Sequence, residues 1–240
     1  MRYVYFGNND LAVELLEWLE PPVGLVVNSV VKAKRRDELV RVSGLPMEQV
    51  FLAEELDAEK LKALEPDIGV SVLFGHILKQ DVIDVFPKGI INLHPAYLPY
   101  NRGAHPNVWC IMDGTPAGAT LHYIDAGIDT GKIICRVKLE VEPWDTAKTI
   151  YDKSMLECSR MFKWVWQNLD DIEGISQEQK NKTYHEVKDL ESLDKIDLNK
   201  TYTGRELINQ LRARTFPPYR GCTFETPDGT VEITVNLKPL

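Results

Sequence analysis

Short apolar runs alternate with helical stretches over residues 1–95. Four of these runs have the length of a buried strand: Tyr3 to Phe6, Val23 to Val27, Ile68 to Phe74 and Gly89 to His94. Asp10 is placed to cap a helix after the first run. Strands and helices in this rhythm are typical of a mostly parallel sheet with helices on both faces. The pattern therefore predicts an α/β fold.

Two further strands and a long helix are predicted downstream. Ala117 to Tyr123 and Lys132 to Val141 flank an irregular loop, and apolar residues recur near helical spacing after Asp145. Residues 171–200 are polar and charged with little periodicity. That composition indicates connecting structure or a partly helical linker.

The C-terminal residues differ in kind from the rest. Arg205 to Arg212 has helical spacing, and a proline-rich loop follows it. Alternating runs on either side of Asp228-Gly229, from Cys222 to Thr226 and from Val231 to Val235, are the pattern of a β-hairpin. We therefore expect three parts: a large domain over residues 1–170, a connecting segment over 171–200, and a small C-terminal helix plus β-hairpin element over 201–240.

Charge and cysteine content narrow the function classes. The chain has 28 Lys and Arg against 36 Asp and Glu, a formal net charge of −8, so it lacks the broad positive field of a nucleic-acid binder. The four cysteines form no C-x-x-C pair and no zinc-site spacing, which predicts reduced thiols, a cytoplasmic location and no metal. No run approaches the ~20 apolar residues of a membrane span. We expect neither a nucleic-acid nor a membrane partner.

A parallel sheet binds its ligands beyond the carboxyl ends of its strands, which points to Gly7-Asn8-Asn9, Phe74-Gly75-His76 and His94-Pro95. Asn92 and His94 are two positions apart on one predicted strand and therefore share a face. Asn can donate to an oxyanion, and His titrates near neutrality. Asp129, in a glycine-rich loop, can orient a histidine. Each also has a structural alternative: a core histidine, an Asn that binds loop backbone, or an Asp that forms a turn.

Four motifs around these residues occur in a fixed order. They are Asn92-Leu-His94-Pro, then Leu98-Pro-Tyr-Asn-Arg-Gly103, then Gly118-Ala-Thr-Leu-His122, then Asp125-Ala-Gly-Ile-Asp129-Thr-Gly. Together they resemble the folate-dependent formyltransferase family. The resemblance is strong over about residues 65–155 and weak over the preceding strands.

This resemblance implies a Rossmann-like catalytic domain that uses 10-formyltetrahydrofolate as co-substrate, with Asn92, His94 and Asp129 as the catalytic residues. The family forms its pterin pocket largely from the backbone after the fourth strand, and a loop closes over it. The implied cofactor-binding residues are Phe74, His76, Ile77, Leu78, Asp125 and Gly127.

Four formyl acceptors are open within the family. A methionyl-tRNA formyltransferase needs a larger C-terminal barrel and a basic surface, and a glycinamide ribonucleotide formyltransferase normally ends soon after its last helix. A formyltetrahydrofolate hydrolase normally carries a regulatory domain ahead of the core. The sugar N-formyltransferases, which act on nucleotide-linked amino sugars, fit best. From a different class, a non-catalytic folate- or nucleotide-sugar-binding protein would not need the three catalytic residues.

Two segments carry the likeness to sugar N-formyltransferases. Tyr100 to Trp109 looks like their Arg-Gly loop, and Leu211 to Gly221 is similar to their nucleotide-binding element. We expect dTDP-4-amino-4,6-dideoxyglucose as acceptor, for surface-glycan (O-antigen) synthesis, with a dTDP-3-amino-3,6-dideoxy sugar as the alternative. The apolar face of the hairpin predicts a homodimer. The expected substrate-binding residues are Asn9, Arg102, His105, Arg212, Phe216 and Tyr219.

Overall fold

The computed structural model describes residues 1–29, 33–178 and 180–240, and they form two compact units. Unit 1 comprises Met1–His94, Thr120–Arg136 and Cys158–Gln177. Unit 2 comprises Pro95–Ala119, Val137–Glu157 and Glu178–Leu240. Each unit is built from three separate stretches of the chain, and the stretches of the two units alternate along the sequence. The sequence analysis instead predicts consecutive parts with boundaries at residues 170 and 200, and that division stays a prediction.

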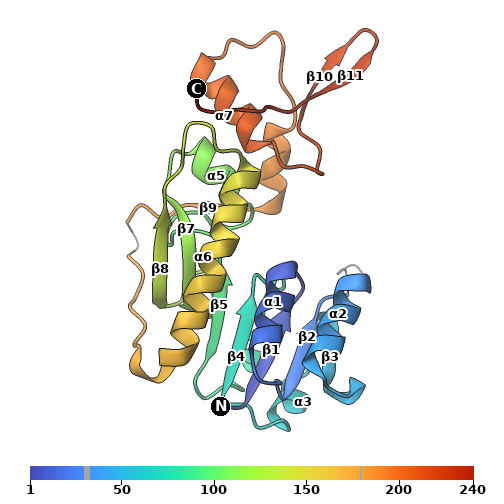
Figure 1. Cartoon of the computed structure of the whole chain (residues 1–240), viewed down its shortest axis with the longest axis vertical. Helices are drawn as coiled ribbons and strands as arrows, with labels where there is room; N and C mark the ends of the chain where they lie inside the picture. The colour runs from blue at the N-terminus through green and yellow to red at the C-terminus, as the bar shows by residue number, and fades with distance from the viewer. Residues whose placement is uncertain (30–32, 179) are drawn as a thin grey trace. The chain divides into compact units, whose positions relative to one another are not determined.

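A seven-stranded sheet is the centre of the fold, with strand order β3-β2-β1-β4-β5-β7-β8 (Figure 1). Strands β1 to β5 pair in parallel, and β7 pairs with β5 in antiparallel orientation. The predicted α/β fold with a mostly parallel sheet is confirmed. The strands are β1 (Tyr3–Gly7), β2 (Gly24–Val27), β3 (Val50–Leu52), β4 (Ile68–Val72), β5 (Ile90–His94), β7 (Ala117–Tyr123) and β8 (Ile133–Leu139).

Alternation along β1 shows why helices cover both faces of the sheet. Tyr3 packs edge-on against Trp166 of α6 (Ala147–Asn168), and the Tyr5 hydroxyl donates to the Ala12 carbonyl of α1 (Asp10–Trp18). Val4 and Phe6 point to the opposite face, where they join a core with residues of α3 (Ala58–Lys62) and α4 (Gln80–Ile83). Every residue of β1 is buried, as a continuous apolar run predicts for a central parallel strand.

The sequence misplaced the start of the first helix by one residue. Asn9, not Asp10, is the N-cap of α1, because its Oδ1 accepts a hydrogen bond from the Ala12 backbone N–H at 2.9 Å. Asp10 is the first helical residue, where a carboxylate still interacts favourably with the helix dipole.

Unit 2 has a separate apolar core. Helix α5 (Pro106–Met112) contributes Val108 and Ile111, which pack with Leu193 and with Ala213 of α7 (Gly204–Ala213). The predicted hairpin is confirmed as β10 (Cys222–Thr226) and β11 (Gly229–Ile233). Among the described residues, the remaining elements are α2 (Ala33–Ser43), the two-residue strands β6 (Arg102–Gly103) and β9 (Tyr184–His185), and 3-10 helices at Met47–Gln49, Ala53–Glu55, Leu169–Asp171 and Val187–Leu193.

Candidate active site

Asn92, His94 and Asp129 lie together in unit 1. Asn92 and His94 are the third and fifth residues of β5 and share its face, and His94 is buried. The His94 Nε2 lies 3.6 Å from the Asp129 Oδ2, and the Asp129 side chain is only 14% exposed. The structure thus brings His94 and Asp129 within ion-pair distance, and it places Asn92 on the same face of β5 as His94.

A row of paired residues crosses the sheet at Asn92. Strand pairing places Ser71 of β4 and His122 of β7 directly beside it, one on each side. The Asn92 Oδ1 lies 2.8 Å from the Ser71 hydroxyl, and the Asn92 Nδ2 lies 3.1 Å from the His122 Nε2. The far nitrogen of that ring, Nδ1, lies 2.8 Å from the Tyr123 carbonyl oxygen.

The Tyr123 carbonyl oxygen, at one end of this row of hydrogen bonds, determines their direction. Because a carbonyl oxygen only accepts, the His122 Nδ1 carries the hydrogen. In the neutral ring, Nε2 is then the acceptor. The Asn92 Nδ2 therefore donates to His122, which leaves the Asn92 Oδ1 to accept from the Ser71 hydroxyl. The amide of Asn92 is oriented with its nitrogen toward His122.

His122 is the site residue that sequence reasoning missed. Its Nε2 lies 3.5 Å from the Asp129 Oδ1, so the Asp129 carboxylate faces the rings of both His94 and His122. The two rings lie edge to face with centroids 6.3 Å apart. His122 is the last residue of the motif from Gly118 to His122, so the sequence analysis named it without giving it a role. Its contact with Asn92 could be predicted only if the order of the strands in the sheet were known.

The loop that carries Asp129 is held in an uncommon conformation. Asp129 has a φ of 52°, in the left-handed region. A β-carbon on Gly131 would collide with the Tyr123 carbonyl oxygen, so only glycine fits there. Asp125 accepts hydrogen bonds from the Gly127 N–H at 3.1 Å and from the Thr130 hydroxyl at 2.5 Å. The Asp125 carboxylate is thus engaged in the turn itself.

Comparison with known proteins identifies the family. Residues 27–162, more than half of the chain, match the family model described as formyl transferase. Residues 189–239 match the model described as N-formyltransferase dimerization C-terminal domain. The chain belongs to the formyl transferase family. The predicted family is confirmed, and the protein is a one-carbon group transferase.

Individual relatives of this formyltransferase are similar over most of their length. A methionyl-tRNA formyltransferase from Clostridium beijerinckii is 31% identical over 226 residues, covering 88% of this chain and 73% of the relative. A 4-N formyltransferase structure from Francisella tularensis has a TM-score of 0.82 at 24% identity, covering 100% of this chain and 98% of that one. The Helicobacter canadensis N-formyltransferase, in complex with folinic acid and dTDP-3-aminofucose, has a TM-score of 0.71 at 25% identity, covering 92% and 82%.

The predicted folate segment of the formyltransferase follows β4. The Phe74 ring packs edge-on against Phe6 at 5.8 Å and lies 6.3 Å from the His76 ring. Ile77 is 71% exposed, whereas Leu78 is buried in the core of unit 1. Leu78 can therefore offer only its backbone to a ligand, while the side chains of His76 and Ile77 remain accessible.

Asn9 is the one predicted substrate-binding residue in unit 1. Besides capping α1, its Nδ2 donates to the Val72 carbonyl at 2.7 Å. Asn9 therefore joins the start of α1 to the end of β4, close to the strand ends where the sequence placed ligands. Both functional groups of its amide are used within the protein.

The other predicted substrate-binding residues lie in unit 2. Arg102 is buried on β6, and His105 precedes α5 with a φ of 52°. Burial and the positive charge of Arg214 lower the pKa of His105. The Arg214 guanidinium in turn binds Asp194 at 2.6 Å.

Arg212 binds the turn that precedes α6 in unit 2, and Phe216 packs against Tyr151 near the start of that helix. The Arg212 Nη1 donates to the Glu142 and Asp145 carbonyl oxygens at 3.2 and 2.9 Å. Phe216 is half-buried, and its ring lies 5.6 Å from that of Tyr219, which is 69% exposed. Tyr219 therefore presents its ring to solvent, whereas Arg212 already binds backbone.

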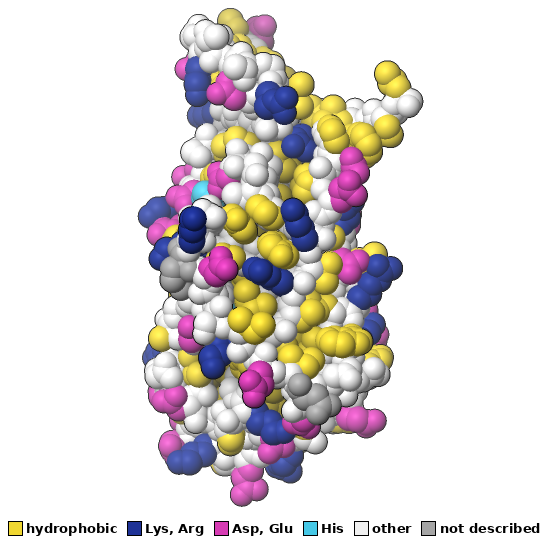
Figure 2. Space-filling view, turned by 90° about the vertical axis from the view of Figure 1, so that its left-hand side faces the viewer, with side chains coloured by type: hydrophobic (Ala, Val, Ile, Leu, Met, Phe, Trp, Pro, Cys, Tyr) yellow, Lys and Arg dark blue, Asp and Glu magenta, His cyan; other side chains and the backbone are white. Residues whose placement is uncertain are grey.

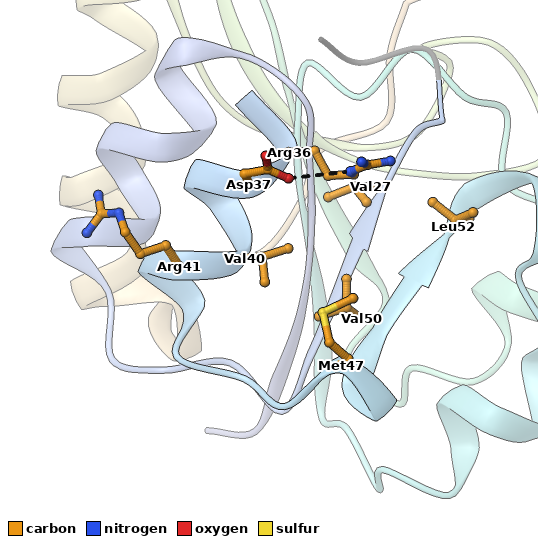
Figure 3. Close-up of a pocket in the computed structure, with 8 residues that line it drawn as sticks. All are labelled: Val27, Arg36, Asp37, Val40, Arg41, Met47, Val50 and Leu52. Atoms are coloured by element: carbon orange, nitrogen blue, oxygen red, sulfur yellow. Dashed lines mark ion pairs between the residues drawn. The ribbon is translucent and has the colours of Figure 1, made fainter. Parts of the chain in front are cut away.

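A cavity of about 560 Å³ lies elsewhere in unit 1 (Figure 3). None of the predicted site residues lines it. It is bounded mainly by aliphatic side chains of β2, α2 and the segment up to β3: Val27, Arg36, Asp37, Val40, Arg41, Met47, Val50 and Leu52.

Within residues 1–29, 33–178 and 180–240, no cluster of three or more His, Cys, Asp or Glu side chains is arranged to hold a metal ion. None of the described helices combines the length and apolar character that a membrane crossing needs.

Proposed function

We propose that this formyltransferase transfers the formyl group of 10-formyltetrahydrofolate to the amino group of a dTDP-linked amino-dideoxy sugar. The observation that carries the proposal is the likeness to the Helicobacter canadensis enzyme, which binds folinic acid and dTDP-3-aminofucose. The preferred acceptor is dTDP-4-amino-4,6-dideoxyglucose, and a dTDP-3-amino-3,6-dideoxy sugar is the alternative. We place the reaction in the cytoplasm and in surface-glycan synthesis.

The catalytic roles rest on the geometry around β5. Of the two hydrogens on the Asn92 Nδ2, one goes to His122, and the other is left for the oxygen of the formyl group. That donor stabilises the negative charge that develops when the sugar amine attacks the formyl carbon. Ser71 and His122 keep the amide in this orientation.

His94 is the proton acceptor in this proposal. The attacking amine must be neutral, and a proton leaves it as the new amide C–N bond forms. His94 takes that proton, directly or through water, and the Asp129 carboxylate 3.6 Å away stabilises the resulting imidazolium. The bond from the formyl carbon to the folate nitrogen then breaks, and the proton passes to that nitrogen.

Binding of the two substrates follows the same proposal. The folate contacts Phe74 to Leu78, with the Asp125 to Asp129 loop over it. The residues predicted to bind the nucleotide-linked sugar are Asn9 in unit 1 and, within unit 2, Arg102, His105, Arg212, Phe216 and Tyr219. Among them the Tyr219 ring is exposed and available to stack on the base. The match of residues 189–239 to a dimerization domain supports a homodimer formed through the C-terminal part of the chain.

Methionyl-tRNA is the second candidate acceptor. The similarity of the curated relatives favours it, since the first of them are methionyl-tRNA formyltransferases at 28–31% identity. Charge argues against it, because the chain carries a net charge of −8 and acidic and basic side chains are interspersed on the face shown in Figure 2. A tRNA-binding surface would neutralise phosphates with clustered Lys and Arg.

The deciding experiment is a panel of acceptors offered with 10-formyltetrahydrofolate. We expect dTDP-linked amino sugars to gain the mass of one formyl group in place of a hydrogen, with the 4-amino sugars reacting fastest. Glycinamide ribonucleotide and methionyl-tRNA serve as competing acceptors. Faster formylation of methionyl-tRNA than of every amino sugar would overturn the proposed acceptor.

A further inference from the structure

Asp129 adopts a left-handed backbone conformation that contacts from its surroundings reinforce. Its φ of 52° lies in a region that non-glycine residues visit uncommonly, although aspartate is among those found there most often. The Asp125 hydrogen bonds fix Gly127 and Thr130, on either side of Ile128 and Asp129. The carbonyls of Asp129 and Gly131 are held from outside the loop.

Gln177 supplies that contact. Its side chain is buried, and its Nε2 lies 2.9 Å from the Asp129 carbonyl oxygen and 2.7 Å from the Gly131 carbonyl oxygen. A primary amide nitrogen carries two hydrogens, so one donates to each carbonyl. The two hydrogen bonds clamp the backbone on both sides of Thr130.

The segment that carries Gln177 is itself anchored. Ile175 and Ile133, the first residue of β8, exchange both backbone hydrogen bonds at 2.8 Å. Gly174 lies so close to Lys132 and Tyr123 that a β-carbon there would crowd both side chains. Gln177 therefore approaches the loop from a fixed position.

We propose that Gln177 is a positioning residue for the formyl transfer, acting through Asp129. By holding the Asp129 backbone it keeps the carboxylate between His94 and His122, at 3.6 and 3.5 Å. Neither family match extends over residue 177, so nothing in the family comparison assigns it a role. The inference rests on the catalytic role proposed above for Asp129.

The first test replaces Gln177 by Met, which keeps the length of the side chain but has no N–H. We expect kcat at saturating substrates to fall about 10- to 100-fold, because small displacements of a catalytic group are costly, with little change in either KM. The matched control is Gln167→Met on the exposed side of α6, which we expect to leave kcat unchanged. If Gln177→Met does not fold, Gln177→Asn, whose amide reaches less far, takes its place.

The second test separates positioning from general stabilisation. In an Asp129→Asn background, Gln177→Met should lower kcat no further, because the group it positions has lost its charge. The same fold-loss in both backgrounds would overturn the proposal.

A third readout does not depend on activity. Backbone amides of residues 124–133 should exchange with deuterium faster in Gln177→Met than in the wild type or in Gln167→Met. If the deuterium exchange of these amides were the same in Gln177→Met as in the wild type, the proposal that Gln177 holds the Asp129 backbone would be wrong. If the wild type formylates no acceptor, the proposed function fails, while faster exchange still supports Gln177 as the residue that places the Asp129 carboxylate.

Discussion

The orientation of one amide decides whether Asn92 can stabilise an oxyanion. A flipped Asn92 would turn its oxygen toward the acceptor nitrogen of His122, and two acceptors would then face each other. The Tyr123 carbonyl prevents this indirectly, because it fixes the tautomer of His122. The Tyr123 carbonyl thus determines which end of the Asn92 amide would face the formyl group in the proposed mechanism.

Removal of the two side chains on β5 that are proposed to be catalytic is expected to abolish most turnover. Asn92→Ala and His94→Ala should each lower kcat by about 10²- to 10⁴-fold, as expected for loss of an oxyanion donor or a general base. Steady-state formylation assays measure the loss. Ser71→Ala, which removes only a hydrogen bond that orients Asn92, should cost less than either. Near-complete retention of kcat in Asn92→Ala or His94→Ala would remove that residue from the mechanism.

The sequence predicted the residues along one strand better than those across strands. Asn92 and His94 could be paired because alternate residues of a strand share a face. His122 and Ser71 are 30 and 21 positions away from Asn92 and meet it only through sheet register. Gln177 was missed because it lies in a polar segment without hydrophobic periodicity. That segment pairs with β8 only through the single bridge between Ile175 and Ile133.

At the scale of elements, the start of α6 in unit 2 is held by a buried carboxylate with several partners. The Asp145 carboxylate accepts from the Glu142 N–H at 2.7 Å and the Thr149 hydroxyl at 2.8 Å, and it binds the Lys153 ammonium at 2.6 Å. Burial alone would raise the pKa of Asp145, but these partners lower it overall. The folded state therefore favours the charged form.

Neutralising this carboxylate should destabilise the fold in a pH-dependent way. Asp145→Asn should lower the free energy of unfolding at pH 7 by about 1–3 kcal/mol. Because the pKa of Asp145 is lowered in the folded state, its charged form stabilises the fold above the ordinary carboxyl pKa, and this stabilisation is lost as the pH falls. The difference in free energy of unfolding between the wild type and Asp145→Asn should therefore shrink from about pH 4 downward. Denaturant titrations across pH measure this difference.

Asp152 provides the matched control for Asp145. It pairs with Lys148 on the same helix, but its side chain is 54% exposed. Asp152→Asn should therefore change the free energy of unfolding by less than about 1 kcal/mol. An equal effect of the two substitutions would show that burial of the Asp145 ion pair contributes nothing.

Long elements were easier to predict than short ones. Six strands of the sheet were located, four of them as continuous apolar runs, whereas the three-residue strand β3 was not predicted. The hairpin was located because Asp228-Gly229 interrupts two alternating runs. Strands β6 and β9 have two residues each and pair across about 80 positions of sequence, so no local pattern could predict them. Helix α6 begins at Ala147 rather than at Asp145 because residues 142–145 form a hydrogen-bonded turn ahead of it.

At the scale of the whole molecule, the two substrates are expected to have separate binding residues. Base stacking on an aromatic ring is worth roughly 1–3 kcal/mol, so Tyr219→Ala should weaken dTDP binding by about 5- to 200-fold. Affinity for a folate analogue should barely change, because the proposed folate residues lie in unit 1. Calorimetric titration with each ligand makes the comparison. Unaltered dTDP affinity in both Tyr219→Ala and Phe216→Ala would place the nucleotide elsewhere.

The interleaving of the units governs the order in which the chain can fold during synthesis. Domains generally fold as they emerge, N-terminal first. All segments of unit 1 have been made once Gln177 is added. The core of unit 2 joins Val108 and Ile150 to Leu193 and Ala213, so its first apolar residues wait for partners made much later.

A nascent chain arrested between Gln177 and Ala213 therefore has uncovered apolar residues in its middle, within residues 95–157. Such surfaces attract chaperones and promote aggregation. Removing residues from Ala213 back toward Gln177 thus damages a region far upstream of the cut, and a slow codon between these two positions would prolong that exposure.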